Sequence, residues 1–233
     1  MISVVIPALN AERTLAATLG ALVPAAVDGC VREVIVVDGG SRDRTPDIAD
    51  LAGADVILSP PSRGGQLRRG AAVARFPWLL FLHADTVLLP GWETEACGFI
   101  RDIESQNRPD AAGVFRFRLN DRGFRARALE ASVHLRCALL AMPYGDQGLL
   151  ISRRLFDSVG GYRDLPIMED IDLVRRLGRR RLQLFETPAV TSAERYRSDG
   201  YLARSLRNQL CLALFGAGLP TNTIVRIYGR AKT

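Results

Sequence analysis

Apolar and polar positions alternate along the first 86 residues with two distinct periods. Buried strands are predicted by four short, continuously apolar runs, at residues 3–6, 33–37, 55–58 and 78–82. Between these runs, helical apolar spacing predicts helices at residues 12–22, 43–51 and 66–74. Strands that alternate with helices of about ten residues are typical of βαβ units, so we expect a parallel sheet flanked by helices.

The pattern becomes less regular in the second part of the chain. Further strands are predicted at residues 111–119, 148–151 and 182–185, and helices at 124–141, 169–180 and 201–215. No segment rich in proline, glycine or serine separates the two parts, and no internal repeat is visible. We therefore expect a single α/β domain over residues 1–233, with a nucleotide-type half at 1–95 and a substrate-type half at 96–233.

Each of the four early strands runs into a segment of polar or glycine residues. These segments are residues 7–10, 38–41, 59–65 and 83–85. Because the carboxyl ends of parallel strands share the edge at which ligands bind, all four segments should lie along one edge. Each has a simpler reading by itself. Segment 38–41 would serve as a tight turn before a helix, and segment 63–65 as an ordinary loop.

The second part of the chain contains further candidate groups. Glu169 and Asp170 open a predicted helix, where acids stabilise the positive end of the helix dipole. The functional alternative is a carboxylate held ionised as a general base. The turns at residues 145–148 and 160–162 carry polar groups that could line an acceptor pocket.

Two common nucleotide-binding motifs are absent. No Gly-x-Gly-x-x-Gly follows the first strand, which argues against a dinucleotide-binding dehydrogenase. A Walker loop needs a lysine, and the only lysine of the chain is Lys232, the penultimate residue.

Composition adds expectations about partners and location. The formal net charge is +6, and every basic residue except Lys232 is arginine, which suits phosphate recognition but also arises from genomic composition. No arginine–aromatic ladder accompanies this charge, so a nucleic-acid partner is not expected. Residues 1–7 lack the basic region of a signal peptide, and no apolar stretch reaches the roughly 18–20 residues of a membrane span. We therefore expect a cytoplasmic protein.

Four cysteines are scattered along the chain, at positions 30, 97, 137 and 211. Their spacing fits neither a zinc site nor a disulfide framework. We expect all four to be small core or surface residues.

Five segments occur in the order seen in family 2 glycosyltransferases of the GT-A fold. They are residues 5–10, 36–41, 81–86, 145–148 and 168–170. The chain resembles in particular a short bacterial subgroup with Phe-Leu-His-Ala-Asp-Thr at the metal motif, here residues 81–86. The resemblance covers nearly the whole chain. It implies a GT-A (Rossmann-like) domain with a mainly parallel sheet flanked by helices, and a smaller acceptor-side region that includes the C-terminal helices.

The resemblance also implies roles for individual positions. A nucleotide sugar is expected at Pro7, Ala8, Asn10, Glu12, Asp38, Gly39, Ser41, Arg63, Gly64, Arg69, His83, Ala84 and Asp85. Asp85 matches the last acid of the Asp-x-Asp motif, which holds Mg²⁺ or Mn²⁺ on the diphosphate, and His83 takes the place of its first acid. Asp170, together with Glu169, matches the catalytic Glu-Asp motif. The acceptor is expected at Gly145, Asp146, Gln147 and Arg195.

The implied activity is an inverting, metal-dependent transfer from a nucleotide-diphosphate sugar, with a UDP-sugar as the expected donor, to an acceptor hydroxyl. The Gln-x-x-Arg-Trp motif of processive synthases is absent and is only loosely matched by residues 193–196, so we expect a non-processive enzyme. Histidine at position 83 leaves an alternative open, a catalytically inactive nucleotide-sugar-binding accessory protein. A pyrophosphorylase would need a glycine-rich loop with arginine and lysine, which residues 7–10 do not provide.

The predicted helix at 201–215 is rich in leucine and carries Arg204 and Arg207 near its start. It fits a helix packed on the core. The alternative is an interfacial helix that meets anionic lipid, which would suit a lipid-linked acceptor and place the protein peripherally on the inner face of the membrane. The sugar, the acceptor and the oligomeric state do not follow from the sequence.

Overall fold

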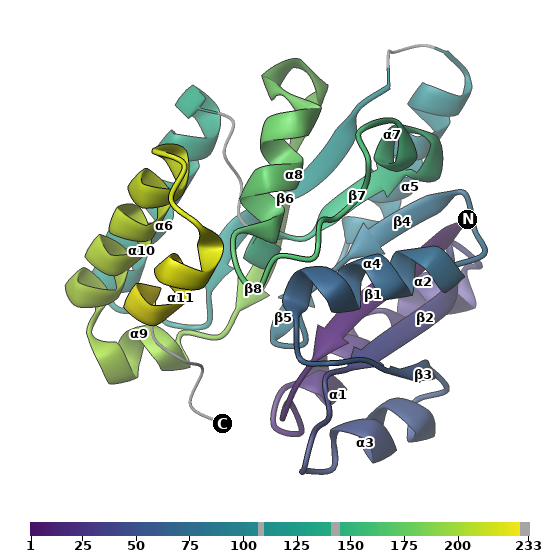
Figure 1. Ribbon diagram of the computed structural model, residues 1–233. Coiled ribbons are helices and arrows are strands. Elements are labelled where there is room, and N and C mark those ends of the chain that lie inside the picture. Colours follow the sequence, from purple (N-terminus) through teal and green to yellow (C-terminus); the bar gives the residue numbers. More distant parts are fainter. Residues whose placement is uncertain (107–109, 141–144, 229–233) are drawn as a thin grey trace.

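The computed structural model describes residues 1–106, 110–140 and 145–228 and contains one eight-stranded sheet with the order β3-β2-β1-β4-β7-β6-β8-β5 (Figure 1). The strands are β1 (Ile2–Ala8), β2 (Val31–Asp38), β3 (Asp55–Leu58), β4 (Trp78–Phe81), β5 (Thr86–Leu88), β6 (Ala112–Leu119), β7 (Leu149–Ser152) and β8 (Leu182–Thr191). The helices are α1 (Leu15–Gly20), α2 (Val23–Val27), α3 (Thr45–Leu51), α4 (Arg63–Val73), α5 (Trp92–Glu104), α6 (Phe124–Leu140), α7 (Arg153–Ser158), α8 (Glu169–Leu177), α9 (Glu194–Asp199), α10 (Tyr201–Gly216) and α11 (Thr221–Tyr228), with 3-10 turns η1 (Gly145–Gln147) and η2 (Arg179–Arg181).

The sheet is parallel in its first part and mixed in its second. Strands β3, β2, β1 and β4 are all parallel, which confirms the βαβ prediction for this region. Beyond β4 the sheet continues through β7, which is antiparallel to both β4 and β6. Strand β8 runs parallel to β6 and antiparallel to β5. The α/β fold expected from the sequence is therefore confirmed, with antiparallel pairs in the second part of the sheet.

Both faces of the sheet are covered. Successive residues of β1 point to opposite sides of the sheet, and each set packs into a different core cluster. Val4 and Ile6 belong to one core cluster, which also contains Trp92 and Phe99 of α5. Val5 belongs to a second cluster, with apolar residues of α4, α7 and α8. Burial on both faces explains why β1, β2 and β4 are largely apolar. The prediction of a buried strand at residues 55–58 is wrong, because β3 lies at the edge of the sheet and is only partly buried.

Several element boundaries differ from the prediction for local reasons. The helix expected at residues 12–22 is shorter and corresponds to α1 alone; a separate helix, α2, follows it, with Pro24 in its first turn, where proline is tolerated. The helix expected at 169–180 ends at Leu177, because Gly178 has a φ of 76° and leaves the helical conformation. Strand β8 continues to Thr191, well beyond the predicted 182–185. The predicted end of α6, residue 141, lies outside the described residues.

The interpretation of the cysteines is wrong for two of the four. Cys30, which precedes β2, forms a disulfide with Cys97 of α5. The two are 67 residues apart, so no local spacing signals the pairing. Cys211 is buried in α10 and Cys137 lies in α6; neither forms a disulfide.

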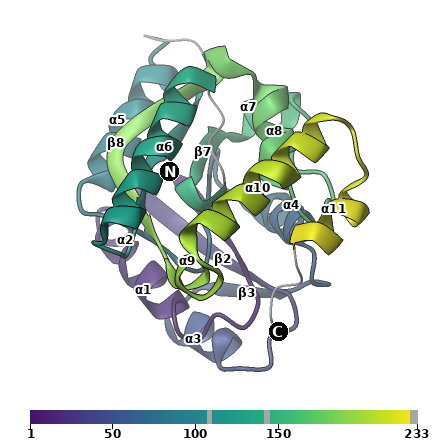
Figure 2. The ribbon, with the colours of Figure 1, turned by 90° about the vertical axis from the view of Figure 1, so that its left-hand side faces the viewer.

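Helix α10 packs against α6, α9 and α11, and these helices lie apart from β3 in Figure 1 and face the viewer in Figure 2. Helix α10 buries Arg204 and Cys211 on one face, while Leu202, Leu206 and Leu210 are exposed on the other. The prediction that this helix packs on the core therefore holds for one of its faces. None of the helices in the described ranges is long and apolar enough to cross a bilayer.

Candidate active site

The loop after β2 is held by its own carboxylate. Both Gly40 and Ser41 donate their backbone N–H groups to Asp38 Oδ2, at 3.0 and 2.9 Å. The Ser41 hydroxyl donates to Asp38 Oδ1. The tight-turn reading of residues 38–41 is thus what the structure shows, and a nucleotide contact by Asp38 or Ser41 stays a prediction.

The loop after β1 is tied to this turn. Asn10, with a left-handed φ of 50°, accepts the Arg42 N–H at 2.9 Å through its side chain. Glu12 accepts the Arg44 N–H at 3.1 Å in the same way. The ends of β1 and β2 therefore form one shaped edge of the sheet, as the parallel arrangement predicts.

Other expected nucleotide-sugar residues make contacts within the fold. Pro7 lies inside β1. Gln66 of α4, which the sequence did not single out, donates to the carbonyl of Ala8 at 2.9 Å, and a Cβ on Gly39 would lie 3.2 Å from its Nε2. Arg69 donates to the carbonyl of Leu58 at 2.9 Å. The Ala84 carbonyl accepts the Thr18 hydroxyl at 3.1 Å. These contacts therefore stabilise the loops at the carboxyl ends of the strands.

Packing requires a glycine at position 64. A Cβ at this position would lie 2.2 Å from the carbonyl oxygen of Arg163 and 2.8 Å from the backbone nitrogen of Leu165. Its N–H donates to the Leu165 carbonyl at 3.2 Å. The first turn of α4 therefore lies directly against the segment that leads to α8.

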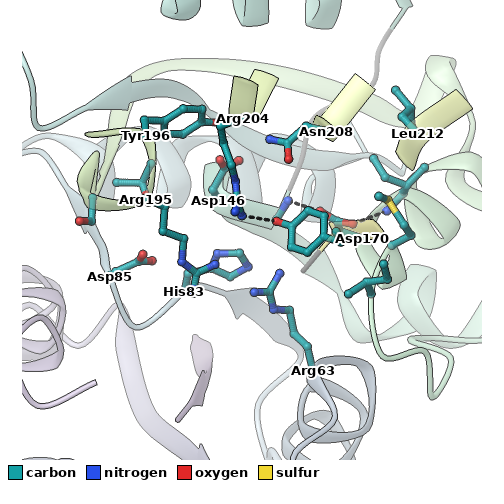
Figure 3. A pocket seen from close by; sticks show the side chains of 17 residues that line it. Arg63, His83, Asp85, Asp146, Asp170, Arg195, Tyr196, Arg204, Asn208 and Leu212 are labelled. Atoms are coloured by element: carbon teal, nitrogen blue, oxygen red, sulfur yellow. Dashed lines mark hydrogen bonds between the residues drawn. The ribbon is translucent and has the colours of Figure 1, made fainter. Parts of the chain in front are cut away.

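A pocket opens between this part of the sheet and the C-terminal helices (Figure 3). Seven of the predicted site residues line it: Arg63, His83, Asp85, Gly145, Asp146, Asp170 and Arg195. The other lining residues are Ile167, Met168, Ile171, Thr191, Ser192, Tyr196, Arg204, Asn208, Leu212 and Tyr228. The structure thus brings the expected metal motif, the expected base and part of the expected acceptor site to one cavity.

His83 and Asp85 project from the turn between β4 and β5. The apolar strand ends at Phe81, and the Thr86 N–H donates to the His83 carbonyl to close the turn. Burial lowers the pKa of His83 well below 6.5, and the charges of Arg63 and Arg195 lower it further. The imidazole is therefore neutral, the form in which a histidine binds metal.

Asp170 is held at the start of α8. Its Oδ2 accepts the backbone N–H of Gly145 at 2.6 Å, and its Oδ1 accepts that of Ile171 at 2.8 Å. A Cβ on Gly145 would lie 2.8 Å from His83 Nε2 and 3.2 Å from Asp170 Oδ2. A side chain at position 145 would therefore push the expected base away from the expected metal ligand.

Asp146 is a second carboxyl group in the same pocket. Burial raises its pKa to about 7, and the charge of Asp170 acts in the same direction. Its neighbour Gln147 is 1% exposed, donates to the Phe115 carbonyl at 2.9 Å and accepts from the Cys137 thiol. Gln147 does not line this pocket, and its expected acceptor contact stays a prediction.

Glu169 lies beside the pocket rather than in its wall. It is 1% exposed, and burial raises its pKa to about 7 although the charge of Arg63 opposes this. Arg63 Nε lies 3.6 Å from Glu169 Oε1. The two members of the Glu-Asp motif therefore have different environments, because successive helical residues point about 100° apart.

The far wall of the pocket consists of side chains from α9, α10 and α11, and we call it the roof: Arg195, Tyr196, Arg204, Asn208, Leu212 and Tyr228. Figure 3 shows Arg204 and Asn208 above the cavity, opposite Arg63 and His83. Arg204 donates to Asp199 at 3.1 Å and to the Tyr228 hydroxyl at 2.9 Å. The sequence reasoning missed most of the roof, although residues 204, 208 and 212 share one helical face.

The site offers a small but suitable set of metal ligands. Across the described ranges, no group of three or more acidic, histidine or cysteine side chains is arranged to hold a metal. Asp85 supplies a hard carboxylate oxygen and His83 a neutral nitrogen, and both line the cavity. These two ligands fit Mn²⁺ or Mg²⁺ that takes its remaining ligands from a diphosphate and water, as Mg²⁺ commonly does.

Curated proteins of related sequence match part of the chain. Glucosyl-3-phosphoglycerate synthase of Mycolicibacterium paratuberculosis is 37% identical over 95 residues, which cover 37% of this chain and 29% of that protein. The PGL/p-HBAD biosynthesis glycosyltransferase of Mycobacterium bovis is 36% identical over 101 residues, which cover 38% and 36%. The aligned part thus spans only about a third of the length of these curated relatives.

Solved structures extend the likeness over most of the chain. The glucosyl-3-phosphoglycerate synthase of Mycobacterium tuberculosis, in complex with Mn²⁺, UDP and glucosyl-3-phosphoglycerate, superimposes with a TM-score of 0.62 at 26% identity and covers 94% of this chain and 81% of its own. Another structure of that enzyme contains Mg²⁺ and UDP. The family profile described as Glycosyl transferase family 2 matches residues 3–145, more than half of the sequence. The chain belongs to glycosyl transferase family 2.

Proposed function

We propose that the protein is a metal-dependent, non-processive glycosyltransferase that moves a sugar from a UDP-sugar to an acceptor hydroxyl with inversion at the anomeric carbon. The observation that carries the proposal is the convergence of His83, Asp85 and Asp170 on one pocket at the carboxyl edge of the parallel strands. The related structures with UDP and Mn²⁺ or Mg²⁺ support the choice of nucleotide and metal.

The chemistry assigns a separate role to each side of the pocket. Asp85 and His83 would hold a divalent cation, which when bound offsets the negative charge of the departing diphosphate. Arg63 lines the same cavity and would bind phosphate oxygens, whereas Arg195, in the roof, is proposed to contact the acceptor. Asn10, Glu12, Asp38 and Ser41, at the adjoining edge, are proposed to face the base and ribose.

Asp170 is the proposed general base. As the acceptor oxygen forms its bond to the anomeric carbon, the hydroxyl proton passes to Asp170 and the bond to the diphosphate breaks with its electron pair on the leaving oxygen. The hydrogen bond from Gly145 holds the carboxylate in place. Direct displacement needs only this one carboxylate, whereas a double displacement also needs a carboxylate nucleophile. Asp146 is a poor candidate for that second role, because a pKa of about 7 keeps much of it protonated.

The test is a panel of nucleotide sugars with Mn²⁺, with Mg²⁺ and with a chelator, in which release of nucleoside diphosphate is measured. We expect UDP-sugars to be turned over only with metal. Candidate acceptors should include 3-phosphoglycerate, because the relative of known structure binds its glucosylated form, and lipid-linked alcohols. The anomeric configuration of the product, read by NMR, tests inversion. Nucleotide binding without hydrolysis or transfer under any condition would favour the inactive accessory protein instead.

A peripheral membrane contact is the second element of the proposal. Leu202, Leu206 and Leu210 are 80%, 70% and 49% exposed along one side of α10, the pattern of a helix that meets a surface. Phe124, at the start of the neighbouring α6, is also exposed. Sedimentation with anionic and with neutral vesicles at low salt tests this contact, and absence from both pellets rejects it. The cytoplasmic location also remains a prediction.

A further inference from the structure

Glu169 is an unusual residue to find next to an active site. It is 1% exposed, and within the described ranges neither of its carboxylate oxygens accepts a hydrogen bond. Burial of a carboxylate without hydrogen bonds is costly, so a buried group of this kind needs an explanation. Its ion pair is with Arg63, whose Nε lies 3.6 Å from Oε1.

The backbone directs Glu169 to this position. Met168, which precedes it, has a left-handed φ of 64°, a conformation that few residues with side chains adopt. This turn begins α8, so that Asp170 reaches the pocket while Glu169 points to the buried side, against the first turn of α4. The close contact between Gly64 and Leu165 joins the same two segments, so both partners of the ion pair are on fixed backbone.

Arg63 needs a fixed partner because several acids surround it. Its side chain is 37% exposed, and its guanidinium forms the ion pair with Glu169. The charges of Glu169, Asp170 and Asp85 all raise the pKa of Arg63, against the effect of burial. Without Glu169, the guanidinium could turn to Asp85 or Asp170 and occupy the expected metal ligand or the expected base.

We propose that Glu169 is a positioning residue. Its buried carboxylate holds the Arg63 guanidinium in the pocket wall and away from Asp85, and in this position the guanidinium binds phosphate oxygens of the nucleotide. The inference rests on the proposed function and gives the first acid of the Glu-Asp motif a role distinct from proton transfer. Glu169 then acts on nucleotide binding only through Arg63.

The test is a double-mutant cycle on UDP affinity, measured by calorimetry with Mn²⁺ and with a chelator. Glu169→Gln keeps the shape and removes the charge, and Arg63→Ala removes the partner. We expect each single variant to weaken UDP binding about tenfold, and the double variant to be no weaker than Arg63→Ala alone. Asp164→Asn is the matched control, because Asp164 also faces an arginine of α4, Arg68 at 3.9 Å, but at the surface; its affinity should stay within about twofold.

Additive losses in the double variant, or unchanged or tighter UDP binding by Glu169→Gln, would overturn the inference. If Glu169→Gln does not fold, Arg63→Lys decides: UDP binding as weak as in Arg63→Ala supports a positioned guanidinium, and wild-type affinity contradicts it. Failure of the wild-type protein to bind UDP with or without Mn²⁺ would reject the proposed function together with this inference. The two failures are distinguishable, because only the second occurs in the wild type.

Discussion

Two neighbouring parts of the candidate site, the sheet edge with the loops after β1 and β2 and the roof of the pocket, are built in different ways. On the first, which we call the nucleotide-sugar edge because it is proposed to bind the donor, the Asp38 side chain accepts a hydrogen bond from its own loop, and the Asn10 side chain accepts one from Arg42 in the loop after β2. In the roof, side chains of α9, α10 and α11 are placed by helix packing, and Arg204 is fixed by Asp199 and Tyr228. The edge depends on strand direction and turn chemistry, whereas the roof depends on how distant helices dock.

The difference suggests a division of function. An edge determined by the sheet suits a ligand that many relatives share, such as a nucleotide. A roof made of individual side chains on a helix can change residue by residue, which suits an acceptor that varies. Substitutions on the two sides should therefore have separable effects on UDP and on acceptor.

The largest effect is expected at the junction between the two sides. Asp170→Asn removes the proposed base but can still accept the Gly145 hydrogen bond. We expect kcat to fall on the order of 10³-fold, while UDP affinity changes little. Steady-state kinetics combined with UDP calorimetry measures both. Turnover at the wild-type rate with saturating substrates would show that Asp170 is not the base.

The second-largest effect is expected on metal-dependent UDP binding at the edge. Asp85→Ala removes the proposed oxygen ligand, so UDP binding in the presence of Mn²⁺ should weaken by about 100-fold, whereas metal-free binding should stay the same. Asp50→Ala, at an exposed position of α3, is the control. Equal losses with and without Mn²⁺ would place Asp85 outside the metal site.

The contact between α4 and the segment before α8 can be tested by packing. In Gly64→Ala, the added Cβ would lie 2.2 Å from the Arg163 carbonyl oxygen, so we expect a loss of about 1–3 kcal/mol in the free energy of unfolding. Gly20→Ala, where no atom lies within 4 Å of the added Cβ, should be neutral or slightly stabilising. Denaturant titration measures both, and equal stability of the two variants would refute the close contact.

The buried position of Glu169 predicts a pH-dependent stability. Its pKa is about 7 in the folded protein against 4.5 for the free group, so the folded state binds this proton more tightly. The stabilisation is complete below about pH 4.5 and is lost as the pH rises through 7. Between pH 5 and 8, the free energy of unfolding of Glu169→Gln should rise by on the order of 2 kcal/mol relative to that of the wild type. Urea titrations measure this, and a difference in the free energy of unfolding between the two proteins that stays constant from pH 5 to 8 would contradict the burial of Glu169.

The smallest effect is expected in the roof. Asn208 Oδ1 is buried without a hydrogen-bond partner within residues 1–106, 110–140 and 145–228, and the residue lines the cavity. Asn208→Ala should raise the acceptor KM by about fivefold and leave the KM of the UDP-sugar unchanged. An equal change in both constants would remove the distinction between edge and roof.

The sequence predicts the nucleotide-sugar edge better than the roof, for physical reasons. Continuous apolar runs identify β1 to β4, and parallel strands necessarily bring their carboxyl ends together. The positions of Asp85 and Asp170 follow from strand and helix ends. Gln66 was missed because an amide that bonds two backbone carbonyls looks like any polar helical residue.

The roof depends on contacts that no local pattern encodes. Residues 204, 208 and 212 share a helical face, but so do 202, 206 and 210, and only docking decides which face lines the pocket. Gly64 similarly looked like a loop glycine, whereas the backbone of Arg163 and Leu165, distant in the sequence, excludes a side chain there. Long-range packing of this kind is visible only in the structure.

The disulfide between Cys30 and Cys97 has its main consequence when the protein is not folded. It closes a loop of 67 residues that contains β2, β3, β4 and β5. An unfolded chain with this closure has fewer conformations to lose, by about 4 kcal/mol in the chain-entropy description. Strands β2 to β5 therefore begin refolding already tethered within one loop, whereas β1 and the helices of the roof lie outside it and must find their places as free chain.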